Sequence, residues 1–233
     1  MASVALIGPD GAGKTTLTRM LAESRELRFK YIYMGIDVGA SNVALPTSRL
    51  AQALKARLKG QTPRNRPGPN RPAPADCPEL PRGAAWAAAR LANRLADEWY
   101  RQGVSWFYQL RGFTALYDRH FVFDFAPEVT GEGAGRLDRR IHRWMLTRFY
   151  PRPDLTVFLD APGELLFARK GELTVEELER RRQAFLAIGR DVPGFVRVDA
   201  TRPLPEVYAA VVREVARLKG PAPGLAVPGR TAR

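Results

Sequence analysis

Short apolar runs alternate with longer stretches of helical periodicity along this chain of 233 residues. Runs such as Ser3 to Ile7 are continuously apolar and end at glycine or proline, which is typical of strands buried on both faces. Between the runs, apolar residues return every four positions, as at Leu91, Leu95 and Trp99, which indicates amphipathic helices. Strands are expected within residues 3–7, 29–34, 113–120, 154–162 and 195–200. Helices are expected around residues 17–21, from 84 to 110, and over 136–150, 172–188 and 205–218.

This alternation predicts an α/β fold with a parallel sheet that is covered by helices on both faces. The length suits one domain, which we expect over residues 1–220, with a flexible tail at 221–233 that is rich in proline, glycine and alanine. The long helix could instead be a kinked pair, and Gly103 is then the point of the break.

A basic, proline-rich segment interrupts the pattern between the second strand and the long helix. Residues 49–82 hold eight Lys or Arg against two acids, and residues 63–81 hold seven prolines. Such a stretch cannot form regular ladders, so we expect an insertion within residues 35–82. It is either a solvated insertion without function or a flap over an anionic substrate.

The charge balance favours anionic partners. The chain carries 37 Lys and Arg against 24 Asp and Glu, a formal charge of +13. Cys77 is the only cysteine, so we expect neither a disulfide within the chain nor a zinc site. The sequence has no basic leader and no apolar stretch of about 18 residues, so we expect a soluble, cytoplasmic protein without a membrane span.

The stretch LIGPDGAGKTT matches the G-x-x-x-x-G-K-[ST] pattern, with a strand before it and a helix after it. Glycines let backbone amides approach a phosphate chain, and the helix adds its positive end. Lys14 is expected to neutralise the outer phosphates of ATP, and the Thr15 hydroxyl to bind Mg²⁺. The predicted phosphate-binding residues are Gly8, Asp10, Gly11, Ala12, Gly13, Lys14, Thr15 and Thr16.

Three classes of protein use this loop: switch GTPases, motor or transporter ATPases, and small-molecule kinases. No N-K-x-D motif for guanine occurs, so a GTPase is not supported. Asp118 and Arg119 follow the third strand, at the sheet edge where ligands bind in parallel sheets. Asp118 is predicted to reach the metal and Arg119 a phosphate oxygen, which favours a kinase.

Several motifs, in this order, resemble thymidylate kinases and their thymidylate-kinase-like relatives: GPDGAGKTT, YDRH, PDLTVFLDAP, ARKGE and VDATRPLPEV. The resemblance implies a P-loop NTPase fold of three α/β/α layers, with a five-stranded sheet in the order 2-3-1-4-5 and ATP on the loop. It also implies that Asp10 accepts a hydrogen bond from an acceptor hydroxyl and that Arg119 clamps an acceptor phosphate. The turn at Asp199, Ala200 and Thr201 would lie beside the adenine.

The segment at about residues 164–190 is similar to the short helical lid of such kinases. A lid arginine that arrives on closure would act on the transferring phosphoryl group. Arg169 and Lys170 are the first candidates, with Arg169 as the catalytic residue, followed by Arg180 and Arg181. Alternatively, residues 180–182 form a solvated helix face paired with Glu176 and Glu177, and for Arg182 we favour that interpretation.

The acceptor side departs from the family pattern. The arginine-glutamate-proline-glycine stretch expected after the second strand is replaced by YMGIDVGAS, which has no arginine. The acceptor is therefore either a nucleoside monophosphate, with dTMP favoured by overall likeness, or another hydroxyl or phosphate compound such as a sugar derivative. His120 could touch the acceptor by position, and His142 is expected to be structural. A nucleic-acid-binding ATPase is the less favoured alternative, and a homodimer stays open.

Overall fold

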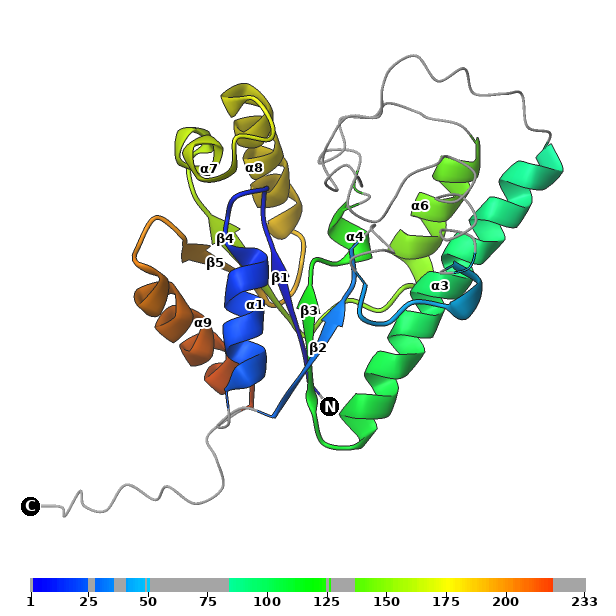
Figure 1. The fold of residues 1–233 in the computed structure, drawn as a ribbon, viewed down its shortest axis with the longest axis horizontal. Helices are drawn as coiled ribbons and strands as arrows, with labels where there is room; N and C mark the ends of the chain where they lie inside the picture. The colour runs from blue at the N-terminus through cyan, green and yellow to red at the C-terminus, as the bar shows by residue number, and fades with distance from the viewer. Residues whose placement is uncertain are drawn as a thin grey trace, which may run out of the picture.

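The computed structural model describes residues 2–24, 28–35, 41–48, 50, 84–124, 126 and 137–219. Strands and helices alternate along these residues (Figure 1), as the apolar pattern predicts. Most of the expected insertion at 35–82, including Cys77, lies outside the described residues, as does the expected tail at 221–233.

A five-stranded parallel sheet forms the centre of the fold, in the order β2-β3-β1-β4-β5. This confirms the sheet and the strand order that the family resemblance implies. All residues of β1, β3 and β4 are buried, because helices cover both faces of these inner strands. The strands are β1 (Ser3–Ile7), β2 (Phe29–Tyr33), β3 (Thr114–Asp118), β4 (Leu155–Asp160) and β5 (Phe195–Asp199).

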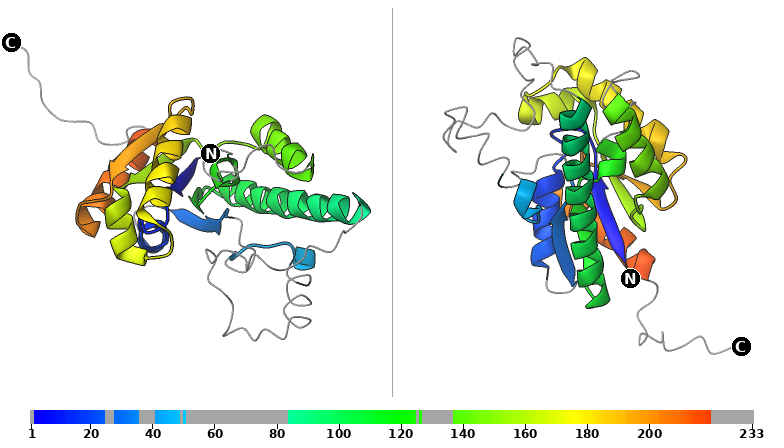
Figure 2. Two further views of the ribbon diagram at one scale, coloured as in Figure 1. Left: turned by 90° about the horizontal axis from the view of Figure 1, so that it is seen from above. Right: turned by 90° about the vertical axis from the view of Figure 1, so that its right-hand side faces the viewer.

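Helices lie on both faces of the sheet (Figure 2), and each face has its own apolar core. One core joins side chains such as Leu17 and Val211, and the other joins side chains such as Leu146 and Phe185. The first face carries α1 (Lys14–Glu23) and α9 (Leu204–Lys219). The second face carries α3 (Ala84–Leu110), α4 (Phe121–Asp124), α6 (Leu137–Phe149) and α8 (Val175–Gly189), and α7 (Gly163–Lys170) precedes α8.

The long helix α3 is continuous through Gly103, so the alternative of a kinked pair is wrong. Its 27 residues span about 40 Å. A Cβ at Gly103 would meet nothing within 4 Å, so this glycine is not required by close packing. In the part of the chain that the structure describes, no helix combines the length and apolar character that crossing a membrane would need.

The register of the strands brings polar residues together at the carboxyl edge of the sheet. Asp118 pairs with Leu6 of β1 and with Tyr33 of β2. Asp160 and Asp199 are opposite each other at the ends of β4 and β5. The loop after β1 begins at this same edge, which is where parallel sheets bind their ligands.

Candidate active site

The candidate phosphate loop, residues 8–16, runs from the end of β1 into the first turn of α1. Gly11 and Gly13 both have a φ of 87°, a left-handed conformation in which other residues are strained. A Cβ on Gly11 would also lie 2.6 Å from the carbonyl oxygen of Leu166. The first turn of α1 has neither a side-chain cap at Gly13 nor an acidic residue. An anion can therefore approach the backbone amides of this turn.

Lys14 lies over the loop with its ammonium group buried. Its Nζ donates hydrogen bonds of 2.7 Å to the carbonyl oxygens of both Gly8 and Pro9. Burial first, and then the positive charge of Arg119, lower the pKa of Lys14 from 10.5 to about 8, against the raising effect of Asp10 and other nearby carboxylates. A bound phosphate would supply negative charge beside Lys14 and so stabilise its charged form, which burial disfavours.

Thr15 and Asp118 meet between the loop and β3. The Thr15 hydroxyl donates a 2.9 Å hydrogen bond to Asp118 Oδ2, and the Tyr31 hydroxyl donates a longer one of 3.4 Å. Asp118 Oδ1 is buried and has no hydrogen-bond partner in the structure. Burial, followed by the Asp118 charge, raises the pKa of the Tyr31 hydroxyl, so this tyrosine stays protonated.

These oxygen donors fit Mg²⁺, which prefers hard ligands and keeps several water molecules. Among the described residues there is no group of three or more His, Cys, Asp or Glu that could hold a metal. Thr15 and Asp118 are the residues that could hold a magnesium ion here, with the rest of its shell supplied by water and phosphate oxygens.

Asp10 and Arg119 form an ion pair across the mouth of the site, with Arg119 Nη2 2.9 Å from Asp10 Oδ1. Arg119 has a φ of 68°, the only positive value for a non-glycine residue in the described chain. Burial disfavours the charged guanidinium, but the carboxylates of Asp124 and Asp10 outweigh burial and raise the pKa of Arg119. Arg119 is therefore a permanent cation at this position.

Two cations from the candidate lid also approach Asp10. Arg181 Nη1 lies 3.4 Å from Asp10 Oδ2, and Lys170 Nζ lies 4.0 Å from Asp10 Oδ1. Asp10 is only 4% exposed, so its carboxylate is largely enclosed. Arg180 points elsewhere on α8 and bonds Glu177 at 2.7 and 2.8 Å.

The expectation that Arg182 belongs to a solvated face is wrong. Its guanidinium bonds the buried carboxylate of Asp160 at 2.5 and 3.1 Å, and it also bonds Glu179 at 2.8 Å. These contacts connect α8 to the end of β4. Arg182 turns to Asp160 because a buried carboxylate needs a charged partner more than an exposed glutamate does. The pKa of Arg182 is raised, chiefly by its hydrogen bonds to Asp160.

A cavity of about 210 Å³ lies beside the loop, where the resemblance implies the adenine. Ala200 lines it together with Arg169, whose Nη2 donates a 3.0 Å hydrogen bond to the Ala200 carbonyl oxygen. Asp199 does not line the cavity but accepts two bonds from Thr201, which lower its pKa and fix the turn. Arg169 therefore lies at the end where the resemblance implies the adenine, whereas Lys170 lies near Asp10. The loop residues that line the cavity are Gly11, Ala12, Gly13 and Thr16.

Sequence reasoning missed Asp124, at the end of α4. Its Oδ2 atom is buried without a hydrogen-bond partner in the structure, and its charge acts on both Arg119 and Lys14. Burial raises the pKa of Asp124 to about 6, although these two cations lower it. The only available signal was its position six residues after Asp118, on the same side of the sheet edge.

Both histidines are core residues. His120 is completely buried, and burial lowers its pKa to about 3. The suggestion that it touches an acceptor is therefore wrong, because the rings of Tyr117, Phe123 and Tyr150 lie against it. His142 bonds the buried Glu98 carboxylate at 2.8 and 2.9 Å, in agreement with a structural role.

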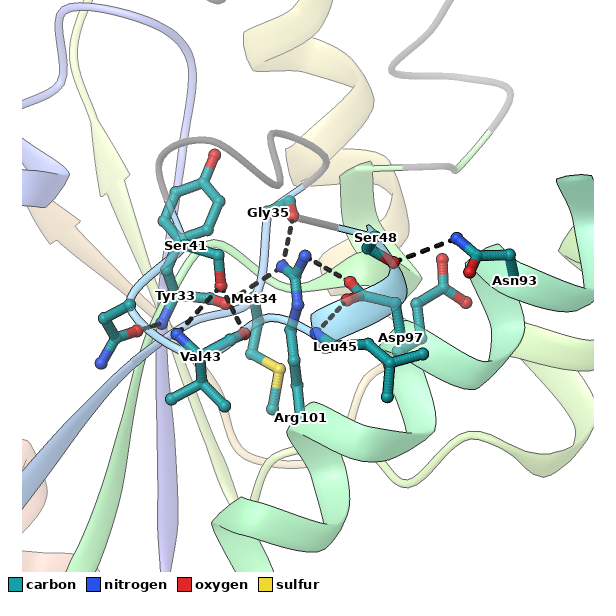
Figure 3. Close-up of polar contacts among 12 residues, drawn as sticks. Tyr33, Met34, Gly35, Ser41, Val43, Leu45, Ser48, Asn93, Asp97 and Arg101 are labelled. Carbon is teal, nitrogen blue, oxygen red and sulfur yellow. Dashed lines mark hydrogen bonds and ion pairs between the residues drawn. The ribbon is translucent and has the colours of Figure 1, made fainter. Parts of the chain in front are cut away.

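A buried ion pair on α3 holds the segment that follows β2 (Figure 3). Arg101 is 1% exposed and donates to the carbonyl oxygens of Gly35 at 3.0 Å and Tyr33 at 3.3 Å. Asp97 accepts from Arg101 and, at 2.7 Å, from the backbone amide of Leu45. The Arg101 guanidinium therefore bonds the backbone of the segment after β2. In the family pattern, that segment carries an arginine of its own. The sequence offered no signal for these contacts, since Arg101 and Gly35 are 66 residues apart.

Comparisons with known proteins support a thymidylate-kinase-like family. A thymidylate kinase from Shewanella amazonensis is 36% identical over 110 residues, which are 43% of this chain and 52% of that protein. A probable thymidylate kinase from Archaeoglobus fulgidus is 31% identical over 107 residues, with the same coverage of both chains. The chain thus spans about half the length of the curated relatives it matches. No protein-family model matches the sequence.

Proposed function

We propose that this thymidylate-kinase-like protein transfers the γ-phosphoryl group of ATP to a nucleoside monophosphate, with dTMP as the favoured acceptor. The observation that carries the proposal is the enclosed Asp10 carboxylate beside the phosphate loop, approached by Arg119 and by two lid cations. Cations from β3 and from the lid converge there, as transfer between two phosphate groups requires.

On the donor side, the amides of residues 11–15 and the Lys14 ammonium would hold the β- and γ-phosphates of ATP. Thr15 and Asp118 would hold Mg²⁺, which supplies positive charge to the phosphate oxygens when it is bound. The cavity bordered by Ala200 and Arg169 would take the adenine. Its 210 Å³ suits a heterocycle that is only partly enclosed.

On the acceptor side, Arg119 would bind the phosphate of the incoming nucleotide, and Asp10 would accept a hydrogen bond from its sugar hydroxyl. Arg181 and Lys170 would move from Asp10 to the phosphoryl group in transit, where charge is spread over the equatorial oxygens. Lid contact would also keep water from the γ-phosphate, which limits hydrolysis.

The test is a product assay with the full chain, ATP and magnesium against separate acceptors: dTMP, other nucleoside monophosphates, and phosphorylated or unphosphorylated sugars. We expect ADP to form only with an acceptor present, and the nucleoside diphosphate to appear in equal amount. Lys14→Ala should abolish both products. ATP hydrolysis that needs DNA or RNA and no small acceptor would reject the kinase and favour the nucleic-acid-binding ATPase.

A non-nucleotide acceptor is the second candidate, and one observation favours it. The segment after β2 has no arginine, and the nearby Arg101 is buried and bonded to the backbone carbonyls of Tyr33 and Gly35. Neither can then recognise a nucleotide as the family's arginine does. Phosphorylation of a sugar derivative, with all nucleoside monophosphates inactive, would decide for this candidate.

A further inference from the structure

A large cavity in the described part of the structure lies away from the phosphate loop, between α6 and the end of α8. Its volume is about 670 Å³, against about 210 Å³ for the cavity at the adenine end. No residue of the phosphate loop lines it. Helices α6 and α8 cover the same face of the sheet (Figure 1), and the cavity lies between them next to α4.

The inner walls of this cavity are apolar. Leu146 of α6 and Val192, just after α8, are buried core residues that reach its surface. Val122 and Ile188 pack against the same core and line the cavity as well. A volume of this size with apolar walls is in the range of small-molecule sites. An apolar molecular body would therefore fit it.

Arginines predominate among the described charged residues at the rim of the cavity. Arg140, Arg143 and Arg152 line it, and none of the three forms an ion pair or side-chain hydrogen bond with a described residue. Among the described residues that line the cavity, Asp191 is the one acidic side chain, and it forms no ion pair or side-chain hydrogen bond with a described residue. Arginines on the lid side of α8, by contrast, are neutralised, as Arg180 is by Glu177. Three unneutralised guanidinium groups around one apolar hollow attract an anion.

Trp144 adds an aromatic surface between the apolar walls and the rim. Its indole is 59% exposed and lines the cavity, with the Phe149 ring at 5.3 Å holding it edge-on. Exposed tryptophan next to arginine is a favourable surface for flat rings that carry a negative charge. Arg143, one turn from Thr147 on the same helix, is the least exposed of the three arginines.

We propose that this cavity is a second ligand site, which binds a small amphipathic anion: a flat apolar body that carries one carboxylate, sulfonate or phosphate group. The body packs on Leu146, Ile188 and Trp144, and the acidic group binds Arg143 together with the neighbouring arginines. The proposal is independent of the acceptor at the phosphate loop.

The test uses anilinonaphthalene sulfonate, an aromatic sulfonate whose fluorescence rises in apolar sites, titrated into the full chain. The neutral probe phenylnaphthylamine is titrated in parallel. We expect the sulfonate to bind more tightly than the neutral probe, and saturating ATP with magnesium not to displace it. Arg143→Glu and, separately, the more exposed Arg140→Glu should each weaken sulfonate binding by about tenfold or more.

Arg148→Glu is the matched control, because Arg148 is an exposed arginine of α6 that does not line the cavity. It should change sulfonate binding by less than about twofold. Thermal unfolding of each variant checks that the fold is kept. Two cavity variants are used so that the test still holds if one of them fails to fold. Equal effects of Arg140→Glu and Arg148→Glu, equal binding of both probes, or displacement by ATP would each overturn the proposal.

Discussion

The buried Lys14 makes the stability of the fold increase as the pH rises, an effect that a lysine exposed to water would not have. Its pKa is lowered from 10.5 to about 8 in the folded chain, chiefly by burial. Below pH 8 the fold must enclose a charged ammonium group, and this disfavours folding. As the pH rises through 8, the folded chain releases the proton first, so the penalty shrinks, and it is gone above 10.5.

The size of the penalty follows from the shift. From 10.5 to about 8 is 2.5 pKa units, and each unit corresponds to about 1.36 kcal/mol, so the penalty at neutral pH is about 3 kcal/mol. Linkage predicts that most of it, about 2–3 kcal/mol, is relieved between pH 7 and pH 10. Lys14→Met removes this titration and keeps a side chain of similar length.

The assay is urea unfolding of the wild type and Lys14→Met at several values from about pH 7 to pH 10, with stability taken from linear extrapolation. The difference between the two proteins removes the titration of all other groups. We expect the wild type to gain about 2–3 kcal/mol relative to the variant over this range. A difference that stays constant within about 0.5 kcal/mol would refute the reasoning, and so would one of opposite sign.

Three further predictions concern single side chains. Asp118→Asn should lower kcat by about 100-fold or more, because a carboxylate oxygen at the proposed metal position is lost; near-normal turnover would remove this residue from the site. Arg181→Met should also lower kcat by about 100-fold, whereas Arg180→Met, its neighbour bonded to a glutamate, should change it by less than about threefold; steady-state kinetics with equal losses would contradict the assignment. Arg101→Met should destabilise the fold by about 3–5 kcal/mol in urea unfolding, because it leaves a buried carboxylate without its charge partner. Its control Arg148→Met should stay within about 0.5 kcal/mol, and a similar small loss for Arg101 would show that the pair is not essential.

The elements were predictable because their signals are local. The continuous apolar run of Ser3–Ile7 and the glycines that follow it specify a buried strand and a tight loop without help from distant residues. Thr174 accepts a hydrogen bond from the Glu177 amide, as the spacing of the two residues predicts for the start of α8. Helix α3 continues through Gly103 because the loss of helix stability caused by one glycine is small compared with the stabilisation from the packing of α3.

The misassigned residues depend on contacts between distant parts of the chain. Arg182 has a glutamate at helical spacing, but the buried Asp160, 22 residues away, takes its guanidinium. His120 is buried partly by the ring of Tyr150, which directly follows α6 in the chain. The Arg101 contacts are of the same kind. Periodicity and motif spacing carry no information on such pairs, whose partners are fixed only when the helices settle on the sheet.

Without substrate, the Asp10 carboxylate holds together the cations that surround it, at the position where a phosphate would bind in the proposed reaction. Three positive groups lie around this one carboxylate, and two of them also pair with other carboxylates: Arg181 with Glu177 at 2.9 Å and Lys170 with Glu172 at 2.8 Å. In the proposed reaction, an arriving phosphate would meet basic groups that are already assembled, so they would not have to be brought together against their mutual repulsion. After the product leaves, the same carboxylate would again hold these groups together, so that each round of the proposed reaction would begin from an assembled site.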